Sequence, residues 1–328
     1  MAKIGIMSFA HMHAYSYAAC LNALDGVEFA AIWDDVPKRG RAAAKQFGTR
    51  FLQDLDAFLG AGVEGVIITS ENVKHRVMAE KAAAAGKWIL CEKPLAPTLD
   101  DAKAIVAACR KANVGLGTAF PCRYAQPLMA VKAQIANGDL GEVYAASCTN
   151  NGQFPGGWFA QDALAGGGAT MDHTVHVADL LRWLTGKEFT KVYCENDRLL
   201  HKNIRTDDIG ILHLEMEGGI QVSHIASWSR AKSFPTWGDV TIEIIGEKGV
   251  VSVDAFNQKL NVYCDTTMRA SWPGWGDNPD LGLVRDFVRA VDERRSPAVT
   301  GIDGLRAVAV TVAAYRSAQL GKTVRIQP

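Results

Sequence analysis

The stretch Lys87-Trp88-Ile89-Leu90-Cys91-Glu92-Lys93-Pro94 joins a short apolar run to a charged pair and a proline. A short apolar run that ends at such a break is typical of a buried β-strand. The stretch therefore predicts a strand over residues 87–91, with Lys93 just beyond its carboxyl end. In open α/β sheets, ligands bind outside the carboxyl ends of the strands. Lys93 is thus a candidate functional residue.

Apolar and amphipathic segments alternate on both sides of this strand. Short apolar runs predict further strands over residues 3–8, 27–33, 64–69 and 114–119, and helical spacing of Ala, Lys, Arg and Glu predicts helices over residues 38–47, 73–85 and 99–112. Strands that alternate with helices form a parallel sheet with helices on both faces. Residues 1–121 are therefore predicted to form a doubly wound α/β domain.

The pattern changes after about Arg123, where the predicted strands become longer. They cover residues 142–150, 190–196, 209–217, 220–227 and 240–245. The glycines of Glu217-Gly218-Gly219 and Gly246-Glu247-Lys248-Gly249 are typical of tight turns between antiparallel strands. Residues 122–328 are therefore predicted to form an α+β domain with a large, mostly antiparallel mixed sheet. Helices over residues 281–291 and 304–320 close the chain, and the second of these is free to pack back on the first domain.

Composition narrows the class of partner. The 328 residues include 35 basic and 35 acidic side chains, so no overall field attracts nucleic acid or an anionic membrane, and neither is expected. No apolar run approaches the roughly 20 residues that cross a bilayer, and no signal-peptide pattern opens the chain, so we expect a cytoplasmic protein. The seven widely spaced cysteines match no zinc or redox motif and are expected to be reduced and mostly buried.

The first predicted strand leads into a turn that departs from the usual dinucleotide-binding fingerprint. Ser8, Ala10 and His13 stand where three glycines are expected. Because Ser and Ala are small, the backbone can still approach a pyrophosphate, whereas His13 implies a looser packing of helix on strand or a role at the ligand. The residues predicted to bind the cofactor in this turn are Ser8, Phe9, Ala10, His11 and Met12.

The end of the second predicted strand carries an acidic residue, Asp34. An acidic side chain at this position accepts hydrogen bonds from the adenosine ribose, which favours NAD over NADP. Lys38 and Arg39 follow it. These two cations either pair with a 2′-phosphate or form the solvated first turn of a helix, and Arg39 is retained as a cofactor candidate.

A second cluster lies far downstream, in Gly166-Gly167-Gly168-Ala169-Thr170-Met171-Asp172-His173-Thr174-Val175-His176. Asp172 and His176 are four residues apart and share one face if the segment is helical. Imidazole titrates near pH 6.5, so His176 can exchange a proton near neutral pH. Together with Lys93, these side chains form a complete set for moving a proton.

Taken together, these motifs resemble the Gfo/Idh/MocA oxidoreductases, which include inositol and sugar dehydrogenases. The resemblance spans nearly the whole chain. It rests on residues 69–75, on Glu92-Lys93-Pro94, on the glycine triplet followed by Asp172 and His176, on residues 182–186, and on residues 303–305 and 315–317. The resemblance implies a Rossmann domain, a second domain whose open sheet face often forms dimers or tetramers, and hydride exchange between a nicotinamide and a sugar-like alcohol.

The same resemblance assigns roles. In it, His176 is the base, Asp172 fixes the tautomer of that imidazole or holds a neighbouring substrate hydroxyl, and Lys93 stabilises the developing alkoxide. It also implies a cis peptide bond between Lys93 and Pro94. Three further residues are placed near the nicotinamide ribose or the cofactor backbone; these are Ser70, Asn72 and Glu92. His75 is either a fourth such residue or a helix cap.

Substrate contacts are expected from the second domain. Arg123 and Tyr124 follow the predicted strand over residues 114–119 and meet substrate hydroxyls, unless Arg123 pairs with a carboxylate between domains. Trp158 offers an aromatic face to the apolar side of a sugar. Trp237 and Trp275 are weaker candidates for this contact.

The two histidines of the first turn, His11 and His13, suggest a metal site with His173 or His176. No third ligand stands at a suitable spacing, so no metal is predicted.

The sequence thus predicts an NAD-dependent dehydrogenase or reductase that acts on a cyclic polyol, a sugar or a sugar derivative. A glycoside hydrolase that retains its NAD is an alternative, and a non-catalytic sensor of dinucleotide or sugar is another. An open sheet face needs a partner to cover it, so a homodimer or homotetramer is expected.

Overall fold

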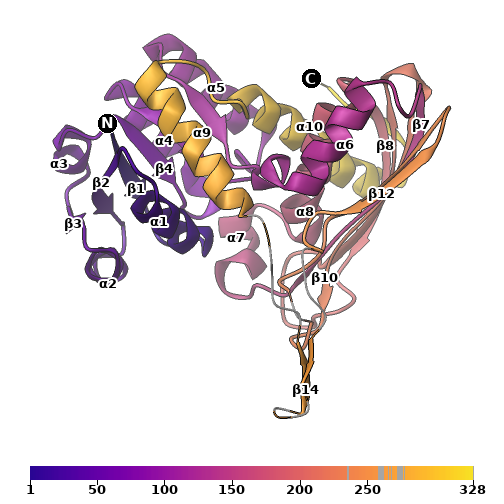
Figure 1. Cartoon of the computed structure of the whole chain (residues 1–328), viewed down its shortest axis with the longest axis horizontal. Helices are drawn as coiled ribbons and strands as arrows, with labels where there is room; N and C mark the ends of the chain where they lie inside the picture. Colours follow the sequence, from indigo (N-terminus) through magenta and orange to yellow (C-terminus); the bar gives the residue numbers. More distant parts are fainter. Residues whose placement is uncertain are drawn as a thin grey trace. The chain divides into compact units, whose positions relative to one another are not determined.

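The computed structural model describes residues 1–234, 236–257, 262–264, 266, 268–271, 276 and 278–327, so Trp275 lies outside the described residues. Backbone contacts divide the chain into two compact units (Figure 1). The first unit contains Met1–Pro121, Ala163–Gly166 and Asp280–Val308. The second contains Cys122–Asp162, Gly167–Pro279 and Ala309–Pro328.

The first unit is built on a six-stranded parallel sheet. Its strands are β1 (Ala2–Met7), β2 (Val27–Trp33), β3 (Arg50–Phe51), β4 (Gly65–Ile68), β5 (Trp88–Cys91) and β6 (Leu116–Thr118), in the order β3-β2-β1-β4-β5-β6. The predicted doubly wound parallel sheet is therefore confirmed. The strand order reverses between β1 and β4, and this switch point is where such sheets bind ligands.

Helices connect these strands. They are α1 (His13–Ala23), α2 (Pro37–Phe47), α3 (Leu55–Gly60), η1 (Asn72–Lys74), α4 (His75–Ala84), α5 (Leu99–Ala112) and, later in the chain, α9 (Pro279–Glu293). The side chain of Thr98 caps α5 by accepting a hydrogen bond from the Asp101 amide.

Two glycines of the sheet show that helices cover both of its faces. Phe58 of α3 packs against Gly5, and Phe287 of α9 packs against Gly65. Gly65 pairs with Ile4, the neighbour of Gly5, and successive residues of a strand point to opposite faces. The two helices therefore lie on opposite sides.

The second unit is built on a seven-stranded sheet. Its strands are β7 (Val143–Gln153), β8 (Phe189–Asp197), β9 (Ile209–Met216), β10 (Gln221–Arg230), β11 (Thr241–Gly246), β12 (Val250–Asp254) and β15 (Val324–Arg325). Their order is β12-β11-β7-β10-β9-β8-β15, and only the β7–β10 pair within this sheet is parallel. The predicted mostly antiparallel mixed sheet is confirmed, and both predicted hairpins form. A separate pair joins β13 (Val262–Cys264) to β14 (Arg269–Ser271).

One long helix, α8 (Ala169–Thr185), packs along this sheet (Figure 1). The remaining helical segments are η2 (Pro121–Tyr124), α6 (Gln126–Ala136), η3 (Gly157–Ala160), α7 (Asp162–Ala165), η4 (Glu217–Gly219) and α10 (Gly301–Leu320). Strand residues alternate between buried and exposed, and the exposed set includes the apolar side chains of Ile211, Ile225, Ile245 and Val250. This sheet therefore presents apolar side chains on its outer face.

Two predictions from composition concern membrane helices and cysteines. Within the part of the chain that the structure describes, no helix combines the length and the apolar character needed to span a bilayer. The cysteines with described side chains form no disulfide and are buried, as predicted; they are Cys20, Cys91, Cys109, Cys122, Cys148 and Cys194.

Candidate functional site

The turn after β1 keeps the backbone shape of a dinucleotide-binding loop without its glycines. Ser8 has φ of 77°, in the left-handed region that glycine favours. Its amide donates to Trp33 O at 2.7 Å, and its carbonyl accepts from Thr69 Oγ1 at 2.7 Å. The Ser8 hydroxyl accepts from the Ala10 amide at 3.2 Å. Ser8 therefore takes the conformation of the missing glycine, and the backbone approach that a pyrophosphate needs is preserved.

The other residues of this turn point in different directions. Phe9 is buried and packs edge-on against Tyr15, whereas Met12 is exposed. His11 is buried and its Nδ1 accepts a hydrogen bond from the His13 amide at 3.1 Å. The first amide of α1 is thus bonded to an imidazole.

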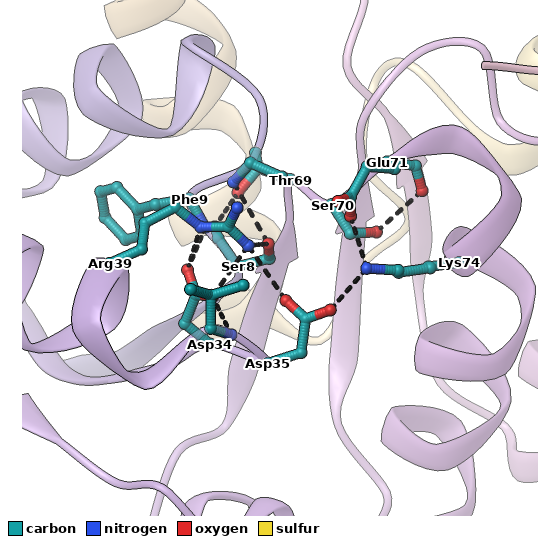
Figure 2. A network of polar contacts seen from close by, with 11 residues as sticks. Ser8, Phe9, Asp34, Asp35, Arg39, Thr69, Ser70, Glu71 and Lys74 are labelled. Atoms are coloured by element: carbon teal, nitrogen blue, oxygen red, sulfur yellow. Dashed lines mark hydrogen bonds and ion pairs between the residues drawn. The ribbon is translucent and has the colours of Figure 1, made fainter. Parts of the chain in front are cut away.

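Asp34 does not face solvent, although its predicted role is to bind a ribose. The residue is 1% exposed. Its carboxylate accepts hydrogen bonds from the amides of Phe9 at 2.8 Å and Val36 at 2.7 Å, and from Nε and Nη2 of Arg39, both at 2.8 Å (Figure 2). Arg39 is therefore bound to Asp34 and is not the solvated residue considered as one alternative.

The next residue, Asp35, is the more accessible carboxylate. Its side chain is 27% exposed and contacts Lys74 Nζ at 2.5 Å and Arg39 Nη2 at 3.0 Å (Figure 2). Burial raises the pKa of Asp35, but the hydrogen bond and charge of Lys74 and the charge of Arg39 outweigh burial and lower it. Sequence reasoning missed both Asp35 and Lys74, because a pair of adjacent aspartates does not reveal which one is buried.

Glu92 organises the carboxyl end of β5. It is fully buried, and its Oε1 accepts from Tyr17 Oη at 2.6 Å and lies 2.8 Å from His13 Nδ1. Its Oε2 accepts from the Lys93 amide at 2.7 Å. Burial raises the pKa of Glu92, but His11, His13 and Lys93 outweigh burial and hold it well below the usual range. Glu92 therefore remains ionised and anchors the loop that carries Lys93.

The same group of side chains has the donor set of a metal site. Among the described residues, His11, His13 and Glu92 place three ligand atoms within 4.8 Å of one another. Glu92 is the third donor that sequence spacing did not reveal, because it lies 79 residues from His13. Burial lowers the pKa of His13, but Glu92 outweighs burial and raises it, so a proton on His13 balances the carboxylate.

Lys93 is 5% exposed and follows β5, and the predicted cis peptide bond to Pro94 is confirmed. His75 holds this loop, since its Nδ1 lies 3.0 Å from Pro94 O and its Nε2 lies 3.2 Å from Ser70 O. Burial lowers the pKa of His75, so the neutral ring donates to one of these carbonyls at a time. His75 is the C-cap of η1, since its amide donates to Asn72 O, and it is also the first residue of α4. The helix cap considered as one alternative is therefore present, and the ring binds two carbonyls in addition.

Asn72 lies nearby in η1 and is buried. Its Nδ2 donates to Ala165 O at 2.9 Å, whereas its Oδ1 has no hydrogen-bond partner among the residues that the structure describes. This buried acceptor suits a ligand hydroxyl.

In the second unit, the glycine triplet fixes the start of α8. A Cβ on Gly168 would lie 1.9 Å from Asp207 O, so only glycine fits this close approach. Asp207 accepts from the amides of Gly168 at 3.0 Å and Thr170 at 2.8 Å. The hydroxyl of Tyr315 donates to Asp207 at 2.6 Å and accepts from the Gly168 amide at 2.9 Å. The carboxylate of Asp207 therefore occupies the positive end of the α8 dipole.

Asp172 and His176 lie one turn apart on this helix, as predicted, and His176 is 9% exposed. Trp228 Nε1 donates to Asp172 Oδ2 at 3.2 Å, and His173 Nε2 lies 3.3 Å from the same oxygen. His173 Nδ1 lies 2.7 Å from Asn150 O. Sequence reasoning missed Trp228, because it lies 56 residues from Asp172.

The predicted substrate residues have contacts within the second unit. Arg123 pairs with Asp179 at 2.5 and 2.8 Å, which is carboxylate pairing inside one unit and not between domains. Tyr124 ends η2 and is half-buried. Trp158 stacks on Phe159 with ring centres 3.9 Å apart, against the buried cluster of Trp228.

Two family models match the chain. The model described as "Oxidoreductase family, NAD-binding Rossmann fold" matches residues 2–120, and the "GFO/IDH/MocA C-terminal domain" matches residues 128–252. The chain belongs to the GFO/IDH/MocA oxidoreductase family. This family membership agrees with the resemblance seen in the sequence motifs.

Individual relatives within the GFO/IDH/MocA family align along almost the whole chain. A D-apiose dehydrogenase from Paraburkholderia graminis is 27% identical, with 98% of this chain and 88% of that protein covered. A 1,5-anhydro-D-fructose reductase from Ensifer adhaerens is 28% identical, with 92% of each protein covered. The crystal structure of GenD2 from gentamicin A biosynthesis in complex with NAD superposes with a TM-score of 0.91 at 26% identity, covering 100% of this chain and 97% of that one.

Proposed function

We propose that the protein transfers a hydride between a nicotinamide dinucleotide and a secondary alcohol of a cyclic polyol, a sugar or a sugar derivative. The observation that carries this proposal is the buried Lys93 at the carboxyl end of β5, whose backbone amide donates to Glu92. The unit that contains it matches an NAD-binding Rossmann family. The relatives named for D-apiose and 1,5-anhydro-D-fructose support a carbohydrate substrate.

Oxidation of a secondary alcohol requires removal of the hydroxyl proton as the hydride leaves the carbon. We assign proton removal to the imidazole of His176 and stabilisation of the developing alkoxide to the ammonium of Lys93. Asp172, whose carboxylate already accepts from Trp228, orients the imidazole or a neighbouring substrate hydroxyl. Bound NAD supplies the hydride acceptor. In the reductive direction, the same groups return the proton.

We assign cofactor binding to residues 1–121, with substrate binding and oligomerisation in residues 122–328. Contacts with the cofactor come from the turn Ser8–Met12, from the ends of β2 and β4, and from the loop of Glu92 and Lys93. The left-handed backbone of Ser8 and the buried acceptor of Asn72 support this assignment. We propose NAD as the preferred cofactor, because NAD is bound in the related GenD2 structure.

Tyr124 and Trp158 are proposed as substrate contacts, with Arg123 supporting them through its pair with Asp179. The apolar side chains on the outer face of the seven-stranded sheet support a homodimer or homotetramer, because burying them removes apolar surface from water. We place the protein in the cytoplasm, where buried cysteines remain in the reduced thiol form.

The proposal is tested by incubating the purified protein with NAD and a panel of inositols, pentoses and anhydrosugars, and by measuring reduced nicotinamide and ketone product together. The expected result is one equivalent of NADH for each ketone formed. Cleavage of a glycoside without net NADH would instead support a hydrolase that retains its NAD. Saturable NADH binding without any product across the panel would support a sensor.

A further inference from the structure

His173, the residue that follows Asp172 on α8, is held on both sides of its ring. Its Nδ1 lies 2.7 Å from Asn150 O in β7, and its Nε2 lies 3.3 Å from Asp172 Oδ2. The His173 side chain is 5% exposed and that of Asp172 is 14% exposed. Gly152 of β7 leaves room for the ring, since a Cβ on this glycine would lie 3.0 Å from His173 Cε1. The imidazole therefore occupies a buried place between β7 and the candidate catalytic carboxylate.

The partners of the His173 ring determine where its hydrogens lie. A backbone carbonyl only accepts hydrogen bonds, so the Nδ1 that faces Asn150 O carries a hydrogen. In a neutral imidazole only one ring nitrogen carries a hydrogen, so Nε2 would face Asp172 Oδ2 as a second acceptor. Two acceptors cannot form a hydrogen bond, and the contact at 3.3 Å is favourable only when a proton lies between the two atoms. His173 and Asp172 therefore hold one proton more than a neutral imidazole and a carboxylate would.

Trp228 indicates which of the two side chains carries this proton. Its Nε1 donates to the same oxygen, Asp172 Oδ2, at 3.2 Å. An indole nitrogen is only a donor and an ionised carboxylate is only an acceptor, so an ionised Asp172 suits two donors at one oxygen. Imidazole is also a stronger base than a carboxylate in model peptides. The proton therefore belongs to His173, which donates from both ring nitrogens as an imidazolium.

A second buried histidine, His224 of β10, interacts with His173 but does not compete with it for a proton. Burial lowers the pKa of His224 to about 3, and the charge of His173 also acts to lower it. His224 is therefore neutral near pH 7, and a positive charge on His173 meets no second buried imidazolium at this position.

We propose that His173 is a positioning residue of the candidate active site, an imidazolium that, together with Trp228, fixes the carboxylate of Asp172. The proposal rests on the proposed function, since it takes Asp172 as the group that orients His176 or a substrate hydroxyl. Two donors on one oxygen restrict the rotation of the carboxylate. A buried carboxylate is costly unless it is paired, so the charge of His173 also keeps Asp172 ionised. His173 thus acts through Asp172.

The charge of His173 is measured by 15N NMR of the whole chain labelled at histidine, without substrate. An imidazolium carries hydrogens on both ring nitrogens and a neutral ring on one, so the 15N shifts of the two forms differ. Near neutral pH, where most free imidazole is neutral, we expect His173 to give imidazolium signals, identified by their loss in His173→Gln. Asp172→Asn removes the charged partner and should convert these signals to those of a neutral ring. A neutral His173 in the wild type would overturn the proposal.

The role in turnover is measured with the polyol or sugar that the wild type oxidises fastest. His173→Leu removes both donors, and kcat should fall roughly 30-fold, because hydrogen bonds to charged groups are the stronger ones. His173→Gln keeps a neutral donor and should lose less. NADH affinity should stay within about two-fold in both variants, since the changes lie in the second unit.

The matched control is His201→Leu, which removes a histidine of the same unit whose Nε2 lies 3.0 Å from the Trp228 carbonyl. Its kcat should stay within about two-fold of the wild type. Equal kcat in folded His173→Leu and His201→Leu would overturn the positioning role. If the wild type formed no NADH with any substrate, the proposed function would fail, whereas the NMR measurement would still decide whether His173 is charged.

Discussion

The two units hold their candidate residues by different kinds of interaction. In the first unit, the Lys93 loop and the turn after β1 are held by buried charged side chains, with Glu92 bonded to His13 and Tyr17 and Asp34 bonded to Arg39. In the second unit, the helix of Asp172 and His176 is held by backbone amides that contact Asp207. The first arrangement depends on protonation, and the second depends on close backbone approach.

This difference also affects ligand binding. The amides at the start of α8 already contact the carboxylate of Asp207, so an anionic ligand gains little there. The first amide of α1 contacts the imidazole of His11 instead. Of these two helix starts, that of α8 has its positive dipole end neutralised by a carboxylate, whereas the first amide of α1 is bonded to an imidazole, an uncharged acceptor. This contrast supports cofactor binding in the first unit.

The largest effect is expected for Lys93→Ala, which removes the ammonium group to which we assign stabilisation of the substrate alkoxide. Turnover should fall roughly 10³-fold, in the range seen when a transition-state donor is lost. NADH affinity should stay within about two-fold, since this change affects the transition state more than the cofactor complex. The exposed helical residue Lys103 provides the control, and Lys103→Ala should retain full activity. Comparable activity in both variants would refute the role of Lys93.

The next effect concerns backbone packing in the second unit. Gly168→Ala places a methyl group against the backbone of Asp207, so the free energy of unfolding should fall by about 3 kcal/mol. Gly249→Ala is the matched control, because its Cβ would meet no atom closer than 4.0 Å, and its effect should stay within about 0.5 kcal/mol. Urea unfolding of both variants measures this. Equal stability of the two variants would contradict the close approach of Gly168 to the backbone of Asp207 at the start of α8.

The pH dependence of stability should have opposite signs for one histidine of each unit. Burial lowers the pKa of His13, but Glu92 outweighs burial and raises it above the ordinary value of 6.5. The His13–Glu92 ion pair therefore adds to the free energy of unfolding below pH 6.5, and this stabilisation is lost as the pH rises through the raised pKa. Burial lowers the pKa of His224 to about 3. The stability gained by burying this neutral imidazole is therefore fully present above pH 6.5 and is lost as the pH falls.

Urea unfolding between about pH 4 and 9 tests these signs. For one titrating group, the free energy of unfolding changes by at most about 1.4 kcal/mol per pH unit. His13→Gln should flatten the loss above pH 6.5, and His224→Leu should flatten the loss below it. The account of the two histidines fails if each substitution flattens the opposite side of the profile.

The smallest effect is expected for Ser8→Gly. Glycine relieves the left-handed backbone at this residue, but it also removes the hydroxyl that accepts from Ala10 and Arg39. These terms oppose each other, so stability should change by less than about 1 kcal/mol and NADH affinity by less than about two-fold. A large loss of affinity, measured by titration, would show that the hydroxyl itself contacts the cofactor.

Much of the fold could be predicted because its signals are local. The apolar run before Lys93 and the helical spacing over residues 99–112 identify β5 and α5 within a few residues. The glycines at residues 217–219 likewise identify the β9–β10 hairpin.

The partners of the candidate residues could not be predicted, because they lie far along the chain. Tyr315 and Asp207 reach the start of α8 from 147 and 39 residues away. The burial of Asp34 was also unpredictable, since adjacent aspartates at the end of a strand carry the same local signal and only the direction of each side chain distinguishes them. The distances and burial on which function depends are tertiary properties.

The most direct test of the central claim is deuterium transfer. The protein is incubated with NAD and polyols or sugars that carry deuterium on the carbinol carbon, and the mass of the reduced nicotinamide is measured. We predict NADH one mass unit heavier in the wild type, with the label nearly absent in Lys93→Ala. Unlabelled nicotinamide with every substrate in the panel, in a protein that binds NADH saturably, would contradict hydride transfer as the function of this chain.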